Sequence, residues 1–206
     1  MNNNQPWMSV VYWEKNDRLG DKFMGCSPEI TIDSGYNPDT DNGKRLCLGP
    51  FCNANRDERT KNIRCHIGSG VKITGGHATS MVTLENLSEH AVFVQSQNWN
   101  ERMSKSSQAI IKLPSKGRAD IFCNIDFSKR LQASVNKGYE NVAALGNMCT
   151  IRLREVLNVN FDQVLLIICT HCYQNNANIF KIFYKFCQRM GRRIQNYPYN
   201  KLAMLD

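Results

Sequence analysis

The spacing of apolar residues predicts a pair of helices in the second half of the chain. Apolar side chains recur three or four positions apart at Phe127, Leu131, Val135, Tyr139, Val142 and Leu145. Gly138 interrupts this helical period, so we expect two helices joined at that glycine. Asp126 is a suitable N-cap residue, and Gly146 with Asn147 ends the pattern with residues that tolerate a left-handed turn.

Alternating apolar and polar positions predict short strands on both sides of these helices. Before the helices, the expected strands cover residues 7–14, 30–32, 45–49, 71–73, 81–84, 91–94, 109–113 and 119–122. After the helices, the expected strands cover residues 149–153 and 164–169. Short strands at this spacing are typical of an antiparallel β-sandwich. The predicted fold class is therefore mainly β with some α.

Four further stretches complete the expected architecture. Residues 55–66 are highly charged and precede a glycine that suits a helix C-cap, which predicts a short helix. Residues 178–190 place their apolar side chains on one face and predict a closing helix. Leu19 and Gly20 are expected to turn the chain after the first strand, and residues 96–107 to form a polar loop. Trp99 in that loop is either an exposed docking anchor or a tucked-in side chain.

Length and composition favour one domain inside the cell. The chain has 206 residues, of which 42% are hydrophobic, enough for a single core. Its start is polar and lacks the apolar segment of a signal peptide. The longest apolar run covers residues 164–169, whereas a membrane-spanning helix needs about 20 residues. We therefore expect no membrane insertion.

Cysteines and histidines show no pattern that predicts a metal, a cofactor or catalysis. Nine cysteines without a secretory signal favour reduced thiols over disulfides. Cys169 and Cys172 form one C-x-x-C pair, and a tetrahedral zinc site needs a second. The four histidines match no nucleophile or metal motif. A non-enzymatic binding module is the expectation.

The net charge of +8 is concentrated towards one end of the chain. Six of the last 26 residues are basic and one is acidic: Lys181, Lys185, Arg189, Arg192, Arg193, Lys201 and Asp206. Such a cluster can contact nucleic acid, an acidic membrane surface or an acidic partner. A solvated helix face is the alternative. Lys181, Lys185 and Arg189 are the candidate basic contact face.

Several stretches resemble, in order, the signature segments of a known family. Residues 47–71 (CLGPFCNANRDERTKNIRCHIGSGV), 87–98 (LSEHAVFVQSQN) and 134–152 (SVNKGYENVAALGNMCTIR) are similar to the C-terminal domain of Smad proteins, the second Mad-homology domain. Residues 7–20 resemble its opening strand and residues 179–191 its last helix. The similarity is closest to receptor-regulated Smads.

The resemblance implies a β-sandwich of the Smad and forkhead-associated type over residues 5–195, followed by a tail over residues 196–206. A loop-helix region would lie at one end and a three-helix bundle at the other. It also implies signalling of the transforming-growth-factor-beta type in cytoplasm and nucleus, through trimers with other Smads and through transcription cofactors. Asp33 and Arg56 match positions that the family uses at its trimer interface. A purely intramolecular role for these two residues is the alternative.

Departures from the family are as informative as the matches. The chain starts at the opening strand, so the DNA-binding domain of Smads is expected to be missing, and with it direct DNA binding. The loop that contacts receptor kinases and phosphoserines is replaced by Leu157, Asn158, Val159 and Asn160, followed by Asp162. This loop lacks the cations that hold phosphate, which argues against receptor contact.

Two further departures concern regulation. Residues 103–107 replace part of the family's anchor-protein surface, and no serine follows Ser134, so the Ser-x-Ser tail is missing. Whether such a chain activates or antagonises signalling stays open. A forkhead-associated-type phosphopeptide-binding module without Smad partners is the alternative function.

Overall fold

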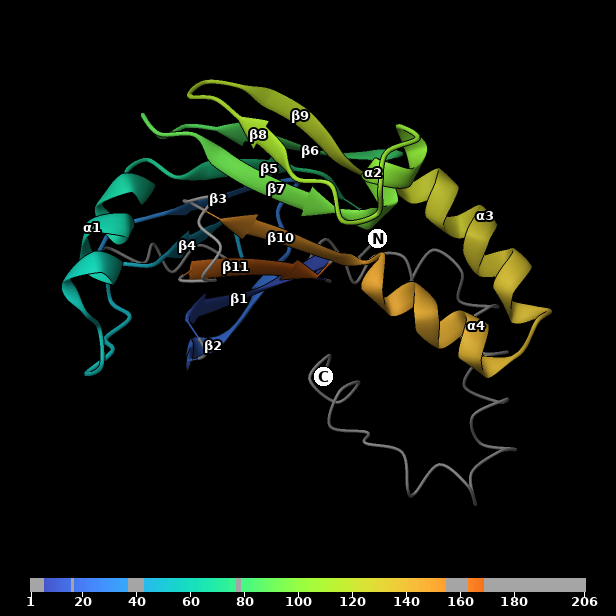
Figure 1. Ribbon diagram of the computed structural model, residues 1–206, viewed down its shortest axis with the longest axis horizontal. Coiled ribbons are helices and arrows are strands. Elements are labelled where there is room, and N and C mark those ends of the chain that lie inside the picture. Colours follow the sequence, from blue (N-terminus) through green and yellow to red (C-terminus); the bar gives the residue numbers. More distant parts are fainter. Residues whose placement is uncertain (1–5, 16, 37–42, 77–78, 155–162, 169–206) are drawn as a thin grey trace, which may run out of the picture.

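Two β-sheets form the body of the protein and helices lie at both of its ends (Figure 1). The computed structural model describes residues 6–15, 17–36, 43–76, 79–154 and 163–168, with only the backbone described for Tyr139 and residues 163–168. Among the described residues, no helix has the length and apolar character needed to cross a membrane.

The first sheet has six strands that pair antiparallel throughout. In spatial order these are β2 (Asp17–Gly25), β1 (Met8–Glu14), β11 (Gln163–Ile168), β10 (Thr150–Arg154), β7 (Val92–Ser96) and β8 (Ile111–Leu113). The expected strands near residues 7–14, 149–153 and 164–169 are thus neighbours, although the last two lie far from the first in sequence.

The second sheet has five strands and is antiparallel except for one pair. In spatial order these are β4 (Arg45–Cys47), β3 (Glu29–Asp33), β5 (Val71–Thr74), β6 (Met81–Asn86) and β9 (Arg118–Cys123). β3 and β4 run parallel. Side chains from the facing sides of both sheets form one core, because alternate residues of a strand point to the same face.

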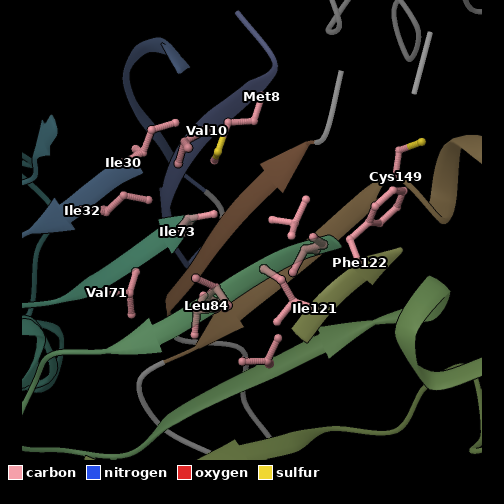
Figure 2. Close-up of a cluster of buried hydrophobic side chains, with 14 of the residues drawn as sticks. Met8, Val10, Ile30, Ile32, Val71, Ile73, Leu84, Ile121, Phe122 and Cys149 are labelled. Atoms are coloured by element: carbon pink, nitrogen blue, oxygen red, sulfur yellow. The ribbon is translucent and has the colours of Figure 1, made fainter. Parts of the chain in front are cut away.

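Apolar side chains fill the space between the sheets (Figure 2). The figure labels Met8 and Val10 of β1, Ile30 and Ile32 of β3, Val71 and Ile73 of β5, Leu84 of β6, and Ile121 and Phe122 of β9. Each of these side chains is at most 3% exposed. This confirms the predicted β-sandwich.

Helices occupy both ends of the sandwich (Figure 1). At one end lies α1 (Glu58–Ile67); at the other lie α3 (Asn124–Val135), α4 (Tyr139–Ala144) and a 3₁₀ turn (Leu145–Asn147). Gly138 has φ +99° and separates α3 from α4, as expected from the interrupted pattern. The predicted closing helix at residues 178–190 lies outside the described residues.

The prediction of a turn at Leu19 and Gly20 is wrong, because both residues lie within β2. The chain reverses earlier, where Lys15 adopts φ +54°. Leu19 pairs with Tyr12 and is buried. Gly20 has φ +70° beside a register shift, and a Cβ there would lie 2.5 Å from the Phe51 ring. The glycine therefore serves close packing inside a strand rather than a hairpin turn.

The predicted polar loop at residues 96–107 begins instead with α2 (Gln97–Arg102). Ser96 caps this helix by accepting a hydrogen bond from the Trp99 amide at 3.3 Å. The Asn98 side chain accepts from the Cys123 amide at 2.7 Å and donates to the Cys123 carbonyl at 3.3 Å. The polar residues of this segment thus complete the edge of β9. Trp99 itself is half-buried.

Two details of the predicted helix pair also differ. α3 starts at Asn124, so Asp126 lies inside its first turn and is not the N-cap. The Asp126 carboxylate instead binds the Arg102 guanidinium of α2, which holds α2 against α3. Gly146 and Asn147 form the 3₁₀ turn and not a left-handed turn, because the backbone continues a helical course into β10.

Replacing Gly70 by alanine should destabilise the fold strongly. Gly70 has φ +66°, and a Cβ there would clash with the Ile32 carbonyl oxygen of β3. Strain of this kind together with a backbone clash costs at least about 2 kcal/mol. Gly146→Ala is the matched control, since nothing lies within 4 Å of the place that a Cβ would take at that residue. Urea unfolding of both variants measures the difference, and equal stabilities would contradict the assignment.

Candidate functional site

A buried carboxylate organises the loop-helix end of the molecule. Glu14, the last residue of β1, is 1% exposed. Arg56 donates to both of its carboxylate oxygens, with Nε–O distances of 3.1 and 3.0 Å. Arg64 of α1 donates to Oε1 at 2.9 Å. The Tyr12 hydroxyl donates to Oε1 at 3.0 Å, and Asn53 Nδ2 donates to Oε2 at 3.2 Å. We call these five residues the Glu14 cluster.

The Glu14 cluster fixes the loop between β4 and α1. Arg56 Nη2 donates to the Phe51 carbonyl at 2.7 Å, and Arg64 Nη2 donates to the Leu48 carbonyl at 2.8 Å. Each guanidinium therefore bridges Glu14 and one carbonyl of the loop. The planar fork of arginine suits such two-sided binding. The loop and the exposed side of α1 are held in one arrangement on β1.

Charge and burial act in opposite directions on Glu14. Burial alone would raise its pKa, but hydrogen bonds from Arg56, Tyr12 and Arg64 outweigh burial and leave the pKa below its ordinary value. Burial raises the pKa of Tyr12 strongly, and the Glu14 charge raises it further against the opposing effect of Arg64. At neutral pH the cluster therefore contains a carboxylate, two guanidinium groups and a neutral phenol.

Asp33 belongs to a second, smaller ion pair at the same end. Its side chain is 8% exposed and accepts from Arg45 Nε at 2.8 Å. Arg45 Nη2 lies 3.3 Å from the other carboxylate oxygen, to which the Gly35 amide also donates at 2.7 Å. This arrangement joins β3 to β4 and starts the loop that follows β3.

The structure brings two of the sequence-predicted site residues to one end and does not describe the others. Asp33 and Arg56 both bind partners within the chain. Their role at a trimer interface remains a prediction, and so does the purely intramolecular alternative. The remaining candidates lie outside the described residues: Leu157, Asn158, Val159, Asn160, Asp162, Lys181, Lys185 and Arg189. No group of three or more potential metal ligands occurs within the described part of the chain.

The outer face of the six-stranded sheet carries cations that the sequence patterns did not single out. Ile151 and Leu153 of β10 point into the core, so Arg152 and Arg154 point outward. On the neighbouring strands, Gln95 lies opposite Arg152, and Lys112 lies beyond Phe93. Burial lowers the pKa of Arg154, and the charge of Arg152 lowers it further. We call Arg152, Arg154 and Lys112 the basic face.

The outer face of the five-stranded sheet has a different charge pattern. Lys72 and Glu85 form an ion pair at 2.8 Å, and Thr83 donates to Asp120 at 3.0 Å. Positive and negative side chains therefore alternate there. On β10, β7 and β8 of the six-stranded sheet, the outward charges among the described residues are all positive. Such asymmetry singles out the basic face as the surface suited to an acidic partner.

Hydrophobic alternation was the signal that could have located the basic face from the sequence. A strand at residues 149–153 with Ile151 facing inward places Arg152 outward. The same argument places Lys112 outward, because Leu113, the next residue of its strand, faces inward. The pairing of the two strands with β7, which brings the cations together, is not visible in the sequence.

Two solved structures share the fold of this chain. The interferon regulatory factor 9 IAD domain matches with a TM-score of 0.55 and 11% identity, covering 88% of this chain and 92% of that one. A chain from the structure of STAT2 in complex with IRF9 matches with a TM-score of 0.57 and 11% identity, covering 86% and 99%. At this identity the likeness concerns the fold alone.

The family follows from the sequence match. The family model of the MH2 domain matches residues 5–157. The chain therefore belongs to the MH2 domain family, which confirms the resemblance to the Smad C-terminal domain. MH2 domains are protein-interaction domains, and both the Glu14 cluster and the basic face lie on this one.

Proposed function

We propose that this chain is a non-enzymatic Smad-type interaction domain in signalling of the transforming-growth-factor-beta type. Its partners are other Smad proteins and transcription cofactors, and it acts in cytoplasm and nucleus. The proposal rests on the MH2 fold together with the basic face. On β10, β7 and β8 of the six-stranded sheet, every outward-facing charged side chain among the described residues is positive. The match to the MH2 domain favours this function over an unrelated forkhead-associated-type module.

The basic face supplies the binding chemistry for an acidic segment of a partner. Guanidinium and ammonium groups form charge-assisted hydrogen bonds to carboxylates or phosphates, which are about twice as strong as neutral ones. Arg152 and Arg154 are two positions apart on one strand, so an extended acidic segment can contact both. Lys112 extends the charge to β8. In this proposal the cations that bind acidic groups lie on strands β10 and β8. The proposal therefore does not depend on residues 157–162.

The loop-helix end supplies the second surface of the proposal. Three residues of α1 are exposed: Arg59, Lys61 and Asn62. The Glu14 cluster holds the opposite side of the helix through Arg64. A surface held in one arrangement before binding loses less conformational freedom on association. We propose that this end packs against a neighbouring Smad, with Asp33 and Arg56 shaping the contact from inside.

Co-precipitation with a common-partner Smad tests this function directly. We expect association in cells both with and without pathway stimulation, because the basic face and the Glu14 cluster are both formed without phosphorylation. A transcriptional reporter measured in the same cells separates an activator from an antagonist. Failure to recover any Smad under either condition would contradict the proposed function.

A further inference from the structure

The segment after α2 connects an exposed serine to the basic face. Residues 103–110 lie between α2 and β8, and Ser106 is exposed outside any helix or strand. Its Oγ accepts a hydrogen bond from the Gln108 amide at 3.4 Å. The Gln108 side chain in turn accepts from Gln95 Nε2 at 2.6 Å, and Gln95 Oε1 accepts from Arg154 Nη2 at 3.4 Å. Ser106 is therefore the outer end of a chain of contacts that ends on the basic face.

The sequence around Ser106 is basic, although the Arg102 side chain is already paired with the Asp126 carboxylate. From Arg102 to Ala119 the chain has five cations and no acidic residue: Arg102, Lys105, Lys112, Lys116 and Arg118. All five are exposed. Lys105 directly precedes Ser106, and Arg102 lies four positions before it. Basic residues on the N-terminal side of a serine favour kinases with acidic substrate-binding clefts, by charge complementarity.

We propose that Ser106 is a phosphorylation site whose phosphate, linked to Arg154 through Gln108 and Gln95, adds negative charge beside the basic face and competes with an acidic partner there. A kinase transfers the γ-phosphoryl group of ATP to Ser106 Oγ, ADP leaves, and the hydroxyl proton is released. The new group carries a charge of about −1.5 to −2 and three acceptor oxygens. It lies next to the Gln108 amide, and the Gln108 and Gln95 side chains connect it to Arg154. The competition with an acidic partner rests on the proposed function of the basic face, whereas the assignment of Ser106 as a phosphorylation site does not.

The link between the phosphate and the basic face through Gln108 and Gln95 can be tested without any partner. The full chain is prepared with phosphoserine incorporated at position 106 and, as a matched control, at Ser69, an exposed serine beside α1. We expect the NMR signals of the Gln95 side-chain amide and the Arg154 guanidinium to shift with phosphoserine at 106 and not at 69. Unchanged Gln95 and Arg154 signals would overturn the inference.

A binding experiment tests the competition. A polyglutamate peptide serves as the acidic probe, and we expect phosphoserine at 106 to weaken its binding about tenfold at 0.05 M salt, with less effect at 0.5 M salt because screening shortens the range of the charge. Equal weakening by phosphoserine at 69 would overturn the competition. If the unmodified chain does not bind polyglutamate, the acid-binding function fails, and the NMR result still decides the phosphate contact.

The acceptor itself is tested with kinases that prefer basic residues before serine. Incubation with ATP and mapping of the phosphate by mass spectrometry should locate it at Ser106, and Ser106→Ala should abolish that signal. Transfer to other serines only, across a panel of such kinases, would overturn the assignment of Ser106 as the site.

Discussion

Replacing Glu14 by glutamine should lower the free energy of unfolding by about 3 kcal/mol at pH 7. The change leaves Arg56 and Arg64 facing a neutral amide at a position that is 1% exposed. Removing one partner of a buried charge cluster is costly because the remaining charges lose their compensation. Urea unfolding monitored by circular dichroism measures the effect. Glu89→Gln, at an exposed glutamate, is the control and should change stability by less than about 0.5 kcal/mol.

The Glu14 variant should also change how stability depends on pH. Because the pKa of Glu14 is lowered in the folded protein, the unfolded chain binds its proton more tightly. The stabilisation from Glu14 is therefore complete above the ordinary glutamate pKa of about 4.3 and is lost as the pH falls through the lower folded value. The difference between wild type and Glu14→Gln should shrink below about pH 4. A constant difference from pH 7 to pH 3 would contradict this role of Glu14.

Reversing two charges of the basic face should abolish most binding of an acidic segment. Arg152→Glu combined with Lys112→Glu should weaken binding of a polyglutamate peptide by about 100-fold or more at low salt. Each lost charge-assisted hydrogen bond contributes about 1.5–3 kcal/mol, and each 1.4 kcal/mol is tenfold in affinity. Fluorescence anisotropy with a labelled peptide measures the dissociation constants.

A matched pair of reversals separates this site from net charge. Lys129→Glu with Lys137→Glu changes the net charge by the same amount on α3 and directly after it, at the end of the sandwich that carries the helix pair. These positions should affect binding less than tenfold, since charges farther apart than the Debye length of about 10 Å at 0.1 M salt are screened. If both double variants weaken binding equally, the attraction is general and not located at the basic face.

The predictable part of this fold was the part set by local periodicity. Alternation around Ile30, Ile73, Leu84 and Ile151 located strands that the structure contains, because each of these side chains must reach a common core. Gly138 was correctly assigned as a break between helices. Predictions were wrong where one residue type can serve two structural roles. Gly20 permits the close approach of Phe51 and does not form a turn. Asp126 pairs with Arg102 and does not cap α3.

The Glu14 cluster could not be predicted from sequence patterns. Glu14 occupies an inward position of a strand, where alternation calls for an apolar side chain. Its compensation comes from Arg56 and Arg64, which lie 42 and 50 positions later in the chain. Taken segment by segment, these arginines belong to a charged helix facing solvent. Only the three-dimensional pairing shows that they balance a buried carboxylate.

The way α2 closes the border of the five-stranded sheet has a consequence for how this protein can assemble. β9 is the last strand of that sheet, and the Ser96 hydroxyl binds the Ile121 carbonyl at 2.5 Å while Asn98 binds the backbone of Cys123. An exposed strand border invites pairing with another chain and the growth of aggregates. Here side chains already occupy the backbone groups that an incoming strand would need. Self-association by strand addition is thereby blocked at this end of β9, which leaves contacts between whole surfaces as the route to assembly there.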